Sequence, residues 1–513
     1  MANKDVPNIL VIMADQLAPQ ALPCYGHGLV DAPHISALAD QGVLFENAYT
    51  NFPLCVPSRA SMMAGRYANA IEVWDNATEF PASTPTIAHY LRSCGYAATL
   101  CGKMHFIGPD QMHGFEQRLV TDVYPSNFAW TPDWTEGPHN RPTGINMRAV
   151  VESGTCQRSL QIDYDDEVEF FAVQKIYDLV RFAENHPFFL TVSFTHPHSP
   201  FITKPEYWDR YRHDDIDMPK VPSIGHNEQD EMSRWLHYAH GGDLDDVTEE
   251  HVRNARHAYY GMISYIDDKV GRIVGTLEEV GLADDTVIVF LADHGEMLGE
   301  RGAWYKQYFY EWSARVPLIV SSPKRFANRR VSELVSLADL LPTAMDLATG
   351  GASWEPVSPL DGRSLVPLLD GDGADWDDVV VSEYTGEGTC APCRMLRRGH
   401  HKLIYTHGHP DLLYDLSEDP DELTNLAGDP RHTETLAALK AELLSGWDPD
   451  EINAKALQSQ KCRRFIQDTT GGEPNWAFKL RDDDDRRYVR NSGAVQTKAK
   501  ARYPFIAPPP VRV

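Results

Sequence analysis

The sequence of 513 residues predicts an α/β protein whose helices alternate with the strands of a buried sheet. Three short, mainly apolar runs carry this prediction, at residues 8–13, 188–194 and 286–291. Such runs are typical of parallel strands that are buried on both faces. Each run leads into Asp or His residues. Because open α/β sheets bind ligands beyond the carboxyl ends of their strands, we expect functional residues at these places.

Helical patterns fill the intervals between the three runs. Residues 165–184 space their apolar side chains as one helical face, directly before the second run. Asp246 and Glu249 resemble a capping box, and the stretch from there to Val280 predicts one or two further helices. The resulting order of strand, helix, strand, helix and strand predicts a doubly wound domain that reaches about residue 370.

A second, smaller unit is expected after the segment 350–377, which is rich in Gly, Pro, Ser and Asp. Short strand candidates at 379–381, 402–405 and 412–416, followed by a helical pattern at 433–444, favour an α+β unit. The end of the chain, with four consecutive aspartates and a run of three prolines, predicts an extended tail that floats or wraps a partner subunit. We therefore divide the chain into a catalytic domain (1–375), a C-terminal subdomain (376–475) and a tail (476–513).

Charge and composition exclude several classes of function. The 47 basic and 74 acidic residues give a net charge of −27, which repels nucleic acid. No apolar run approaches the roughly 20 residues of a membrane-spanning helix, and no signal cleavage site follows the first run. The eight cysteines are scattered too thinly to indicate a disulfide framework. These features predict a cytoplasmic protein with neither a membrane nor a nucleic acid as partner.

The most informative motif is Cys55-Val-Pro-Ser-Arg59. It resembles the signature of the sulfatase family, in which the cysteine is oxidised to formylglycine. A hydrated aldehyde offers two hydroxyls, so one can attack sulfur and the other can later be deprotonated to expel sulfate. If this segment begins a helix, Arg59 is placed for the alkoxide of the nucleophile. The helix N-terminus would also favour bound anions. The alternative is a buried structural thiol.

A metal site is expected where two predicted strands end, at Asp15 with Gln16 and at Asp293 with His294. Their oxygen and nitrogen donors suit a hard divalent cation. In sulfatases and the wider alkaline-phosphatase superfamily, the positions that match Asp15, Asp293 and His294 bind metal. The resemblance implies one ion, Ca²⁺ with Mn²⁺ or Mg²⁺ as alternatives, with Gln16 and Cys55 completing the ligand set. Taken singly, each carboxylate would more commonly be a helix cap.

The resemblance also implies a set of catalytic cations and histidines around the transferred sulfuryl group. Lys103 and His105 lie in a Gly-Lys-Met-His motif, and Lys306 in a Trp-Tyr-Lys motif. Such groups stabilise the negative charge that builds up in the transition state. His198 matches a histidine that moves a proton near the leaving oxygen or the aldehyde hydrate. Outside these motifs, a lysine would more commonly be a solvated surface residue. We expect His196, two residues before His198, to have a structural role.

Further motifs, spread over nearly the whole chain, look like the choline-sulfatase branch of the family. They include residues 75–79, 102–110, 113–116, 121–125, 130–133, 193–198 and 293–301. This resemblance implies an alkaline-phosphatase-like α/β fold, with a mixed sheet flanked by helices. It also implies a cytoplasmic homo-oligomer, dimer or tetramer, in which the tail reaches a neighbouring subunit, and a maturation enzyme that makes the formylglycine.

In that branch a quaternary ammonium group is held by aromatic faces and carboxylates. The matching positions are Asn76, Trp130, His139, Asn140 and Glu387. An indole face attracts a cation through its quadrupole, although Trp130 could instead pack in the core. The branch brings a further carboxylate from the tail, but residues 491–500 contain no acidic side chain. The loss of this carboxylate would weaken selection for choline by about 1–3 kcal/mol. Other alkyl, aryl or zwitterionic sulfate esters are therefore alternative substrates.

Our interpretation is a formylglycine sulfatase that hydrolyses a small organic sulfate ester to alcohol and inorganic sulfate. The enzyme alternative is a phosphonate monoester or phosphodiester hydrolase, because the same nucleophile and metal serve phosphoryl transfer. The non-enzyme alternative is a relative that binds sulfate esters without turnover, which would show gaps among the catalytic residues. Cys390 and Cys393 have a Cys-x-x-Cys spacing, which we interpret as two ordinary thiols lining a pocket wall rather than a redox pair.

Overall fold

The computed structural model describes residues 6–182, 186–470, 476–488 and 502–506. Its large sheet has the strand order β11-β2-β10-β9-β1-β7-β3-β4. The three strands predicted from the sequence lie side by side at its centre, with β1 (Asn8–Ala14) between β7 (Phe188–Ser193) and β9 (Thr286–Ala292). All three are parallel and almost wholly buried, as their apolar sequences predict.

The outer strands make the sheet mixed. On one side lie β10 (Arg315–Ser321), β2 (Val43–Tyr49) and β11 (Arg329–Ser336), and on the other β3 (Ala97–Gly102) and β4 (Gln117–Arg118). β10 is antiparallel to both of its neighbours, whereas the other pairs are parallel. The predicted mixed sheet flanked by helices is confirmed, with β10 as its antiparallel strand.

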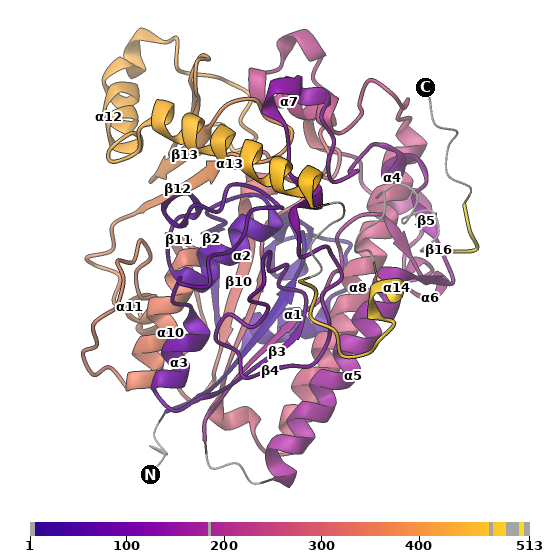
Figure 1. Ribbon diagram of the computed structural model, residues 1–513, viewed down its shortest axis with the longest axis vertical. Helices are drawn as coiled ribbons and strands as arrows, with labels where there is room; N and C mark the ends of the chain where they lie inside the picture. The colour runs from indigo at the N-terminus through magenta and orange to yellow at the C-terminus, as the bar shows by residue number, and fades with distance from the viewer. Residues whose placement is uncertain (1–5, 183–185, 471–475, 489–501, 507–513) are drawn as a thin grey trace.

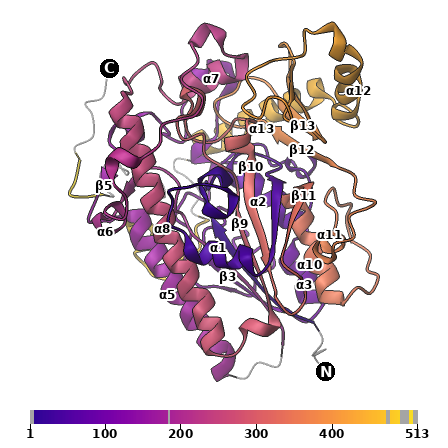
Figure 2. The ribbon, with the colours of Figure 1, turned by 180° about the vertical axis from the view of Figure 1, so that it is seen from behind.

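Helices cover both faces of this sheet. One face carries α1 (Pro33–Asp40), α5 (Leu160–Arg181) and α8 (Glu249–Glu279), which lie in front of the strands in Figure 2. The other face carries α2 (Cys55–Ala64), α3 (Ile87–Ser93) and α10 (Leu340–Thr349), which face the viewer in Figure 1. None of the helices among the described residues is at once long enough and apolar enough to cross a membrane.

The two long helices begin at places other than those predicted. Helix α5 begins five residues early, because Ser159 caps it by accepting a hydrogen bond from the backbone N–H of Ile162 (3.1 Å). The predicted capping box of Asp246 and Glu249 is wrong. Thr248 is the residue directly before α8, and it exchanges hydrogen bonds with His251.

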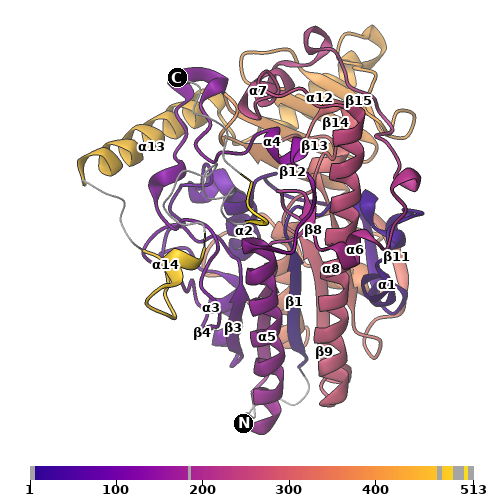
Figure 3. The same ribbon diagram turned by 90° about the vertical axis from the view of Figure 1, so that its right-hand side faces the viewer.

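The C-terminal region forms a separate antiparallel sheet in the order β12-β13-β14-β15. Its strands are β12 (Val379–Tyr384), β13 (Cys393–Arg398), β14 (His401–Thr406) and β15 (Leu412–Asp415). Apolar residues of the sheet pack against α12 (Thr433–Leu443). The sequence did not predict α13 (Pro449–Thr469). In Figures 1 and 3 the small sheet, α12 and α13 lie together at one end of the large sheet.

The remaining elements are short and lie in the connections. The short helices are α4 (Arg148–Val151), α6 (Pro205–Trp208), α7 (Glu231–Ala239), α9 (Glu311–Ala314), α11 (Val366–Asp370) and α14 (Asp484–Arg487). The short strands are β5 (Gly154–Thr155), β6 (Arg158–Ser159), β8 (Ile202–Thr203) and β16 (Arg502–Tyr503). The pairing of β16 with β6 attaches a late segment of the chain to the catalytic region.

Candidate active site

The candidate site lies where the central parallel strands end. Asp15 follows β1, Lys103 follows β3 and Asp293 follows β9, so strand register alone brings the three together. Gly102 has a φ of +108°, and a Cβ there would lie 2.0 Å from the carbonyl oxygen of Ser193. Only glycine fits this close approach, which lets the Lys103 backbone bond to the same carbonyl (3.0 Å).

The candidate nucleophile is the first residue of α2. The Cys55 sulfur lies 3.2 Å from Nε2 of His294, 3.6 Å from Nζ of Lys103 and 3.8 Å from Oδ1 of Asp15. Its position at a helix N-terminus favours a bound anion. Burial, reinforced by the charge of Asp15, raises the pKa of the Cys55 thiol to about 11. The unmodified thiol is therefore protonated at neutral pH and is a weak nucleophile.

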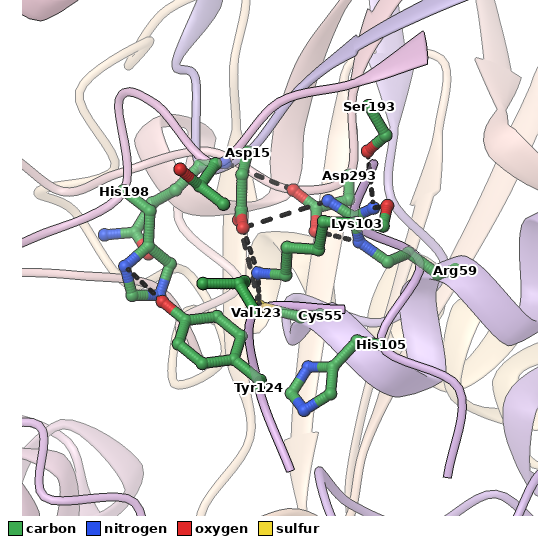
Figure 4. A network of polar contacts seen from close by, with 12 residues as sticks. Asp15, Cys55, Arg59, Lys103, His105, Val123, Tyr124, Ser193, His198 and Asp293 are labelled. Carbon is green, nitrogen blue, oxygen red and sulfur yellow. Dashed lines mark hydrogen bonds and ion pairs between the residues drawn. The ribbon is translucent and has the colours of Figure 1, made fainter. Parts of the chain in front are cut away.

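Arg59 lies beneath the site, with its side chain fully buried. Its Nε donates to Oδ2 of Asp293 (2.8 Å), and its Nη1 donates to the Lys103 carbonyl (2.6 Å) and to Oγ of Ser193 (2.9 Å). Figure 4 shows the guanidinium pointing toward Asp293 and Ser193. The sequence placed Arg59 beside the nucleophile, whereas its hydrogen bonds fix the strand ends that carry Asp293 and Lys103.

Four side chains make a pocket of metal-ligating atoms, all within 4.8 Å of one another: Asp15, Cys55, Asp293 and His294. All four are buried, and their oxygen and nitrogen donors fit a hard divalent cation. Burial alone would raise the pKa of Asp15, but the charges of the neighbouring Lys103 and Arg59 hold it well below its usual range. The carboxylate is therefore ionised and able to bind metal.

Gln16, the fifth predicted ligand, has left-handed backbone geometry with a φ of 64°. Its side-chain nitrogen contacts Glu296, which leaves the amide oxygen directed to the site. In the structure this oxygen accepts a hydrogen bond from Nζ of Lys306 (2.6 Å). Non-glycine residues in this conformation are strained by about 1–3 kcal/mol and are concentrated at functional sites.

Two lysines, Lys103 and Lys306, and two neutral imidazoles, those of His105 and His198, belong to the same buried site. Lys103 contacts Asp15, and Lys306 donates to Nε2 of His198 (2.6 Å). Burial and the charge of Lys306 lower the pKa of His198 well below its usual value. Burial and Lys103 lower the pKa of His105 to about 3, and neither of its ring nitrogens has a hydrogen-bond partner. Together with Arg59, the two lysines give the site three cations, against the two carboxylates of Asp15 and Asp293. This excess of positive charge suits an anionic substrate.

The predicted cation pocket is joined to the nucleophile by Asn76. Its Oδ1 accepts from the backbone N–H of Val56 (3.1 Å), and its Nδ2 donates to Oε1 of Glu387 (3.1 Å). Glu387 is only 3% exposed, and its Oε2 has no hydrogen-bond partner. Burial raises the pKa of Glu387 to about 7.

The other predicted pocket residues fall into two groups. Trp130 is half-buried, and its ring packs against His105 and Tyr124, with centroids 5.6 and 5.3 Å apart. His139 is exposed and packs against Tyr238, and Asn140 bonds within its own loop. Among the described residues no hydrogen bond joins His139 or Asn140 to the Asn76–Glu387 pair, so their role stays a prediction.

His196, expected to be structural, bonds through Nδ1 to Oδ2 of Asp165 (2.6 Å) in the interior. All eight cysteines are free. Burial raises the pKa of Cys390 to about 11 and of Cys393 to about 12. Both thiols are therefore poor sources of thiolate, which favours the interpretation as ordinary thiols.

Sequence reasoning missed the support that α13 gives to the pocket. Arg463 donates to both oxygens of Asp75 (2.7 and 2.6 Å), the residue next to Asn76. Gln460 accepts from the backbone N–H of Trp134 (3.1 Å). Both side chains are buried. No local pattern could indicate these contacts, because Arg463 and Asp75 are 388 positions apart.

Replacing Arg463 by methionine is expected to lower the free energy of unfolding by about 3–5 kcal/mol, because it leaves the carboxylate of Asp75 buried and unpaired. We also expect KM to rise more than kcat falls, since Asp75 positions the Asn76 loop and not the reacting groups. Urea unfolding and steady-state kinetics check both effects. Arg464→Met, a change at a more exposed neighbour, is the control, and an unaltered KM in Arg463→Met would contradict the positioning role.

The α/β fold carries candidate metal-ligating carboxylates at its strand ends and a candidate nucleophile at a helix N-terminus, with cations around them. This arrangement is typical of a metal-assisted hydrolase of anionic esters. Comparison with known proteins narrows this class. Residues 7–351 match the sulfatase family, and residues 299–447 match the C-terminal part of N-sulphoglucosamine sulphohydrolase. The chain belongs to the sulfatase family and is a sulfuric ester hydrolase.

Individual relatives agree with this assignment. The choline-sulfatase of Rhizobium meliloti (strain 1021) is 42% identical over 510 residues, covering 97% of this chain and 98% of that protein. The arylsulfatase of Clostridium perfringens (strain 13 / Type A) is 27% identical and covers 85% and 94%. Among solved structures, the phosphonate monoester hydrolase of Agrobacterium radiobacter superposes with a TM-score of 0.68 at 28% identity, covering 88% and 96%. The predicted resemblance is confirmed.

Proposed function

We propose that the enzyme hydrolyses a small sulfate ester of a cationic alcohol, choline sulfate or a close relative, through a formylglycine made from Cys55. The observation that carries the cationic substrate is the buried carboxylate of Glu387, whose Oε2 has no partner. An unpaired buried charge is costly, and a quaternary ammonium group would compensate it without needing a hydrogen bond. The similarity to a choline-sulfatase over almost the whole chain supports the same conclusion.

The reaction converts an ester and water into an alcohol and inorganic sulfate. Formylglycine at position 55, as its hydrate, would supply two hydroxyls, one for attack on sulfur and one for the later release of sulfate. Asp15, Asp293 and His294, with position 55 and Gln16 as further candidate ligands, would hold a divalent cation that would supply Lewis acidity. Both agree with membership of a family that generally uses a metal ion and formylglycine.

The remaining catalytic work falls to side chains near Cys55. The ammonium groups of Lys103 and Lys306 neutralise charge on the sulfuryl oxygens as it develops. Because Lys306 donates to Nε2 of His198, this pair can pass a proton to the departing alcohol oxygen. His105 is neutral, and its two unpartnered nitrogens can bind a sulfuryl oxygen or accept a proton from the nucleophile.

The Glu387→Gln variant tests the cationic substrate. We expect kcat/KM for choline sulfate to fall about 10- to 100-fold, which corresponds to losing a charge-assisted contact, while a neutral aryl sulfate changes less than about 3-fold. Glu434→Gln, at an exposed residue of α12, is the control. An equal decrease in kcat/KM for both substrates would show that Glu387 does not recognise the cationic group of the substrate.

The pH dependence of KM follows from the pKa of Glu387, which burial raises to about 7. Below that pH the carboxyl is protonated and neutral, so it loses its attraction for a cation. We therefore expect KM for choline sulfate to rise as the pH falls through about 7 and to level off above it. KM for an aryl sulfate, and both KM values in Glu387→Gln, should lack this step.

Phosphonate monoester hydrolysis is the second candidate, favoured by the structural similarity to the Agrobacterium radiobacter enzyme. The test compares kcat/KM for choline sulfate, an aryl sulfate and a phosphonate monoester on one fully matured preparation. A preference for the phosphonate would replace the sulfatase proposal.

Assembly and location belong to the same proposal. We propose a cytoplasmic homo-oligomer, dimer or tetramer, matured by a formylglycine-generating enzyme, with the chain divided at about residues 375 and 475. The stretch 491–500, which lacks the expected tail carboxylate, lies outside the described residues. Size-exclusion chromatography with light scattering tests the subunit count.

A further inference from the structure

A second group of possible metal ligands lies in the small C-terminal sheet and not in the catalytic domain. It consists of His400, His401 and Asp415, whose ligating atoms all lie within 4.8 Å of one another. His400 is in the turn between β13 and β14, His401 is the first residue of β14, and Asp415 ends β15. His401 and Asp415 are partners across the antiparallel ladder.

The turn brings the two neighbouring imidazoles to the same side of the sheet. Their ring centroids are only 4.2 Å apart, although successive residues of a regular strand point to opposite faces. The backbone carbonyl of His400 accepts a hydrogen bond from Leu416 (2.8 Å), which fixes the turn against the end of β15. A third imidazole, that of His432, has its centroid 6.2 Å from that of His401.

The carboxylate of Asp415 is oriented toward the two rings. Its Oδ1 accepts hydrogen bonds from the backbone N–H (3.0 Å) and Oγ (2.6 Å) of Ser417. Its Oδ2 lies 3.8 Å from Nε2 of His400 and 4.0 Å from Nε2 of His401, too far for hydrogen bonds. Three ligating atoms therefore converge on one point without satisfying one another. In known metal sites, hydrogen bonds such as those from Ser417 hold the ligand side chains in orientation.

We propose that His400, His401 and Asp415 form a zinc site, with His432 or water as the fourth ligand. Tetrahedral zinc with bonds of about 2.0–2.2 Å places its ligand atoms roughly 3.3 Å apart. The distances from Oδ2 of Asp415 to the two imidazoles, 3.8 and 4.0 Å, need to shrink by less than about 1 Å, within the freedom of partly exposed side chains. Imidazole and carboxylate donors suit zinc, whereas the oxygen-rich catalytic set suits a harder cation.

A third group of possible metal ligands among the described residues, His34 with Asp267 and Asp268, differs. There the Asp267 carboxylate already accepts hydrogen bonds from the backbone N–H groups of His34 (3.1 Å) and Ile35 (2.7 Å), so it caps α1.

The test is a zinc titration of the full-length enzyme in an excess of Ca²⁺, the ion proposed for the catalytic site. Isothermal calorimetry is expected to show one zinc ion per chain. His400→Ala, a change at an exposed position, should weaken binding at least about 10-fold, and Asp415→Asn should do the same. Hydrolysis of the sulfate ester, measured without zinc, should be unchanged in both variants. His409→Ala, in the turn between β14 and β15, is the matched control.

Cobalt(II) gives a second readout, because its visible absorption reports tetrahedral coordination. We expect a tetrahedral spectrum in the parent enzyme that is lost in His400→Ala and kept in His409→Ala. The proposal is overturned if the parent enzyme binds no zinc under these conditions, or if binding is unchanged in His400→Ala and Asp415→Asn. Neither result depends on whether the enzyme prefers choline sulfate.

Discussion

Replacing Cys55 by alanine is expected to lower kcat for sulfate-ester hydrolysis by on the order of 10⁴-fold or more, the scale of losing a catalytic nucleophile. The candidate metal ligands and the two lysines converge on this residue. Steady-state kinetics on choline sulfate and an aryl sulfate measure the effect. The fold should persist, because alanine suits the first turn of a helix.

Mass spectrometry of the peptide around position 55 completes this test. Conversion of the cysteine to formylglycine lowers its mass by about 18 Da, and we expect activity to scale with the converted fraction. Cys462→Ala removes an exposed thiol and is the control. Full activity in a sample whose Cys55 is entirely unmodified would show that formylglycine is not the nucleophile.

The sequence predicted those parts of the site that depend on local pattern and on strand direction. Residues 8–13 and 286–291 are apolar runs, each followed by an aspartate, and parallel strands place their carboxyl ends at one edge. Asp15 and Asp293 therefore meet for a reason that is visible in the sequence. Position 55 was found through its motif, and the structure puts it at the start of α2 beside them.

What the sequence could not predict depends on contacts between distant segments. The direction of Arg59 is set by Ser193 and Asp293, which lie 134 and 234 positions away. The strand β13 was missed because three arginines interrupt its apolar alternation. Two of them have partners distant in sequence: Arg394 pairs with Glu383 and Arg398 with Glu442. Helix α13 buries few residues of its own, so its amphipathic pattern is weak.

Replacing Arg59 by methionine is expected to lower both stability and turnover. The change removes a fully buried cation and leaves the carboxylates of Asp15 and Asp293 facing each other with less compensation. Breaking a buried pair in this way lowers the free energy of unfolding by about 3–5 kcal/mol. We expect kcat to fall on the order of 10²- to 10³-fold, because Asp293 and the Lys103 backbone lose their fixed positions.

The effect of a metal ion on stability distinguishes the loss of charge compensation from a simple loss of packing. A divalent cation between Asp15 and Asp293 would compensate their charge, so the stability lost in Arg59→Met should be smaller in saturating Ca²⁺ than in a chelator. Arg59→Lys keeps the charge but cannot make all three hydrogen bonds, so we expect partial recovery of stability and little recovery of turnover. Urea unfolding of the three proteins, with and without Ca²⁺, measures the difference. An equal loss in both conditions would mean that Arg59 stabilises the fold by packing and not by balancing the two carboxylates.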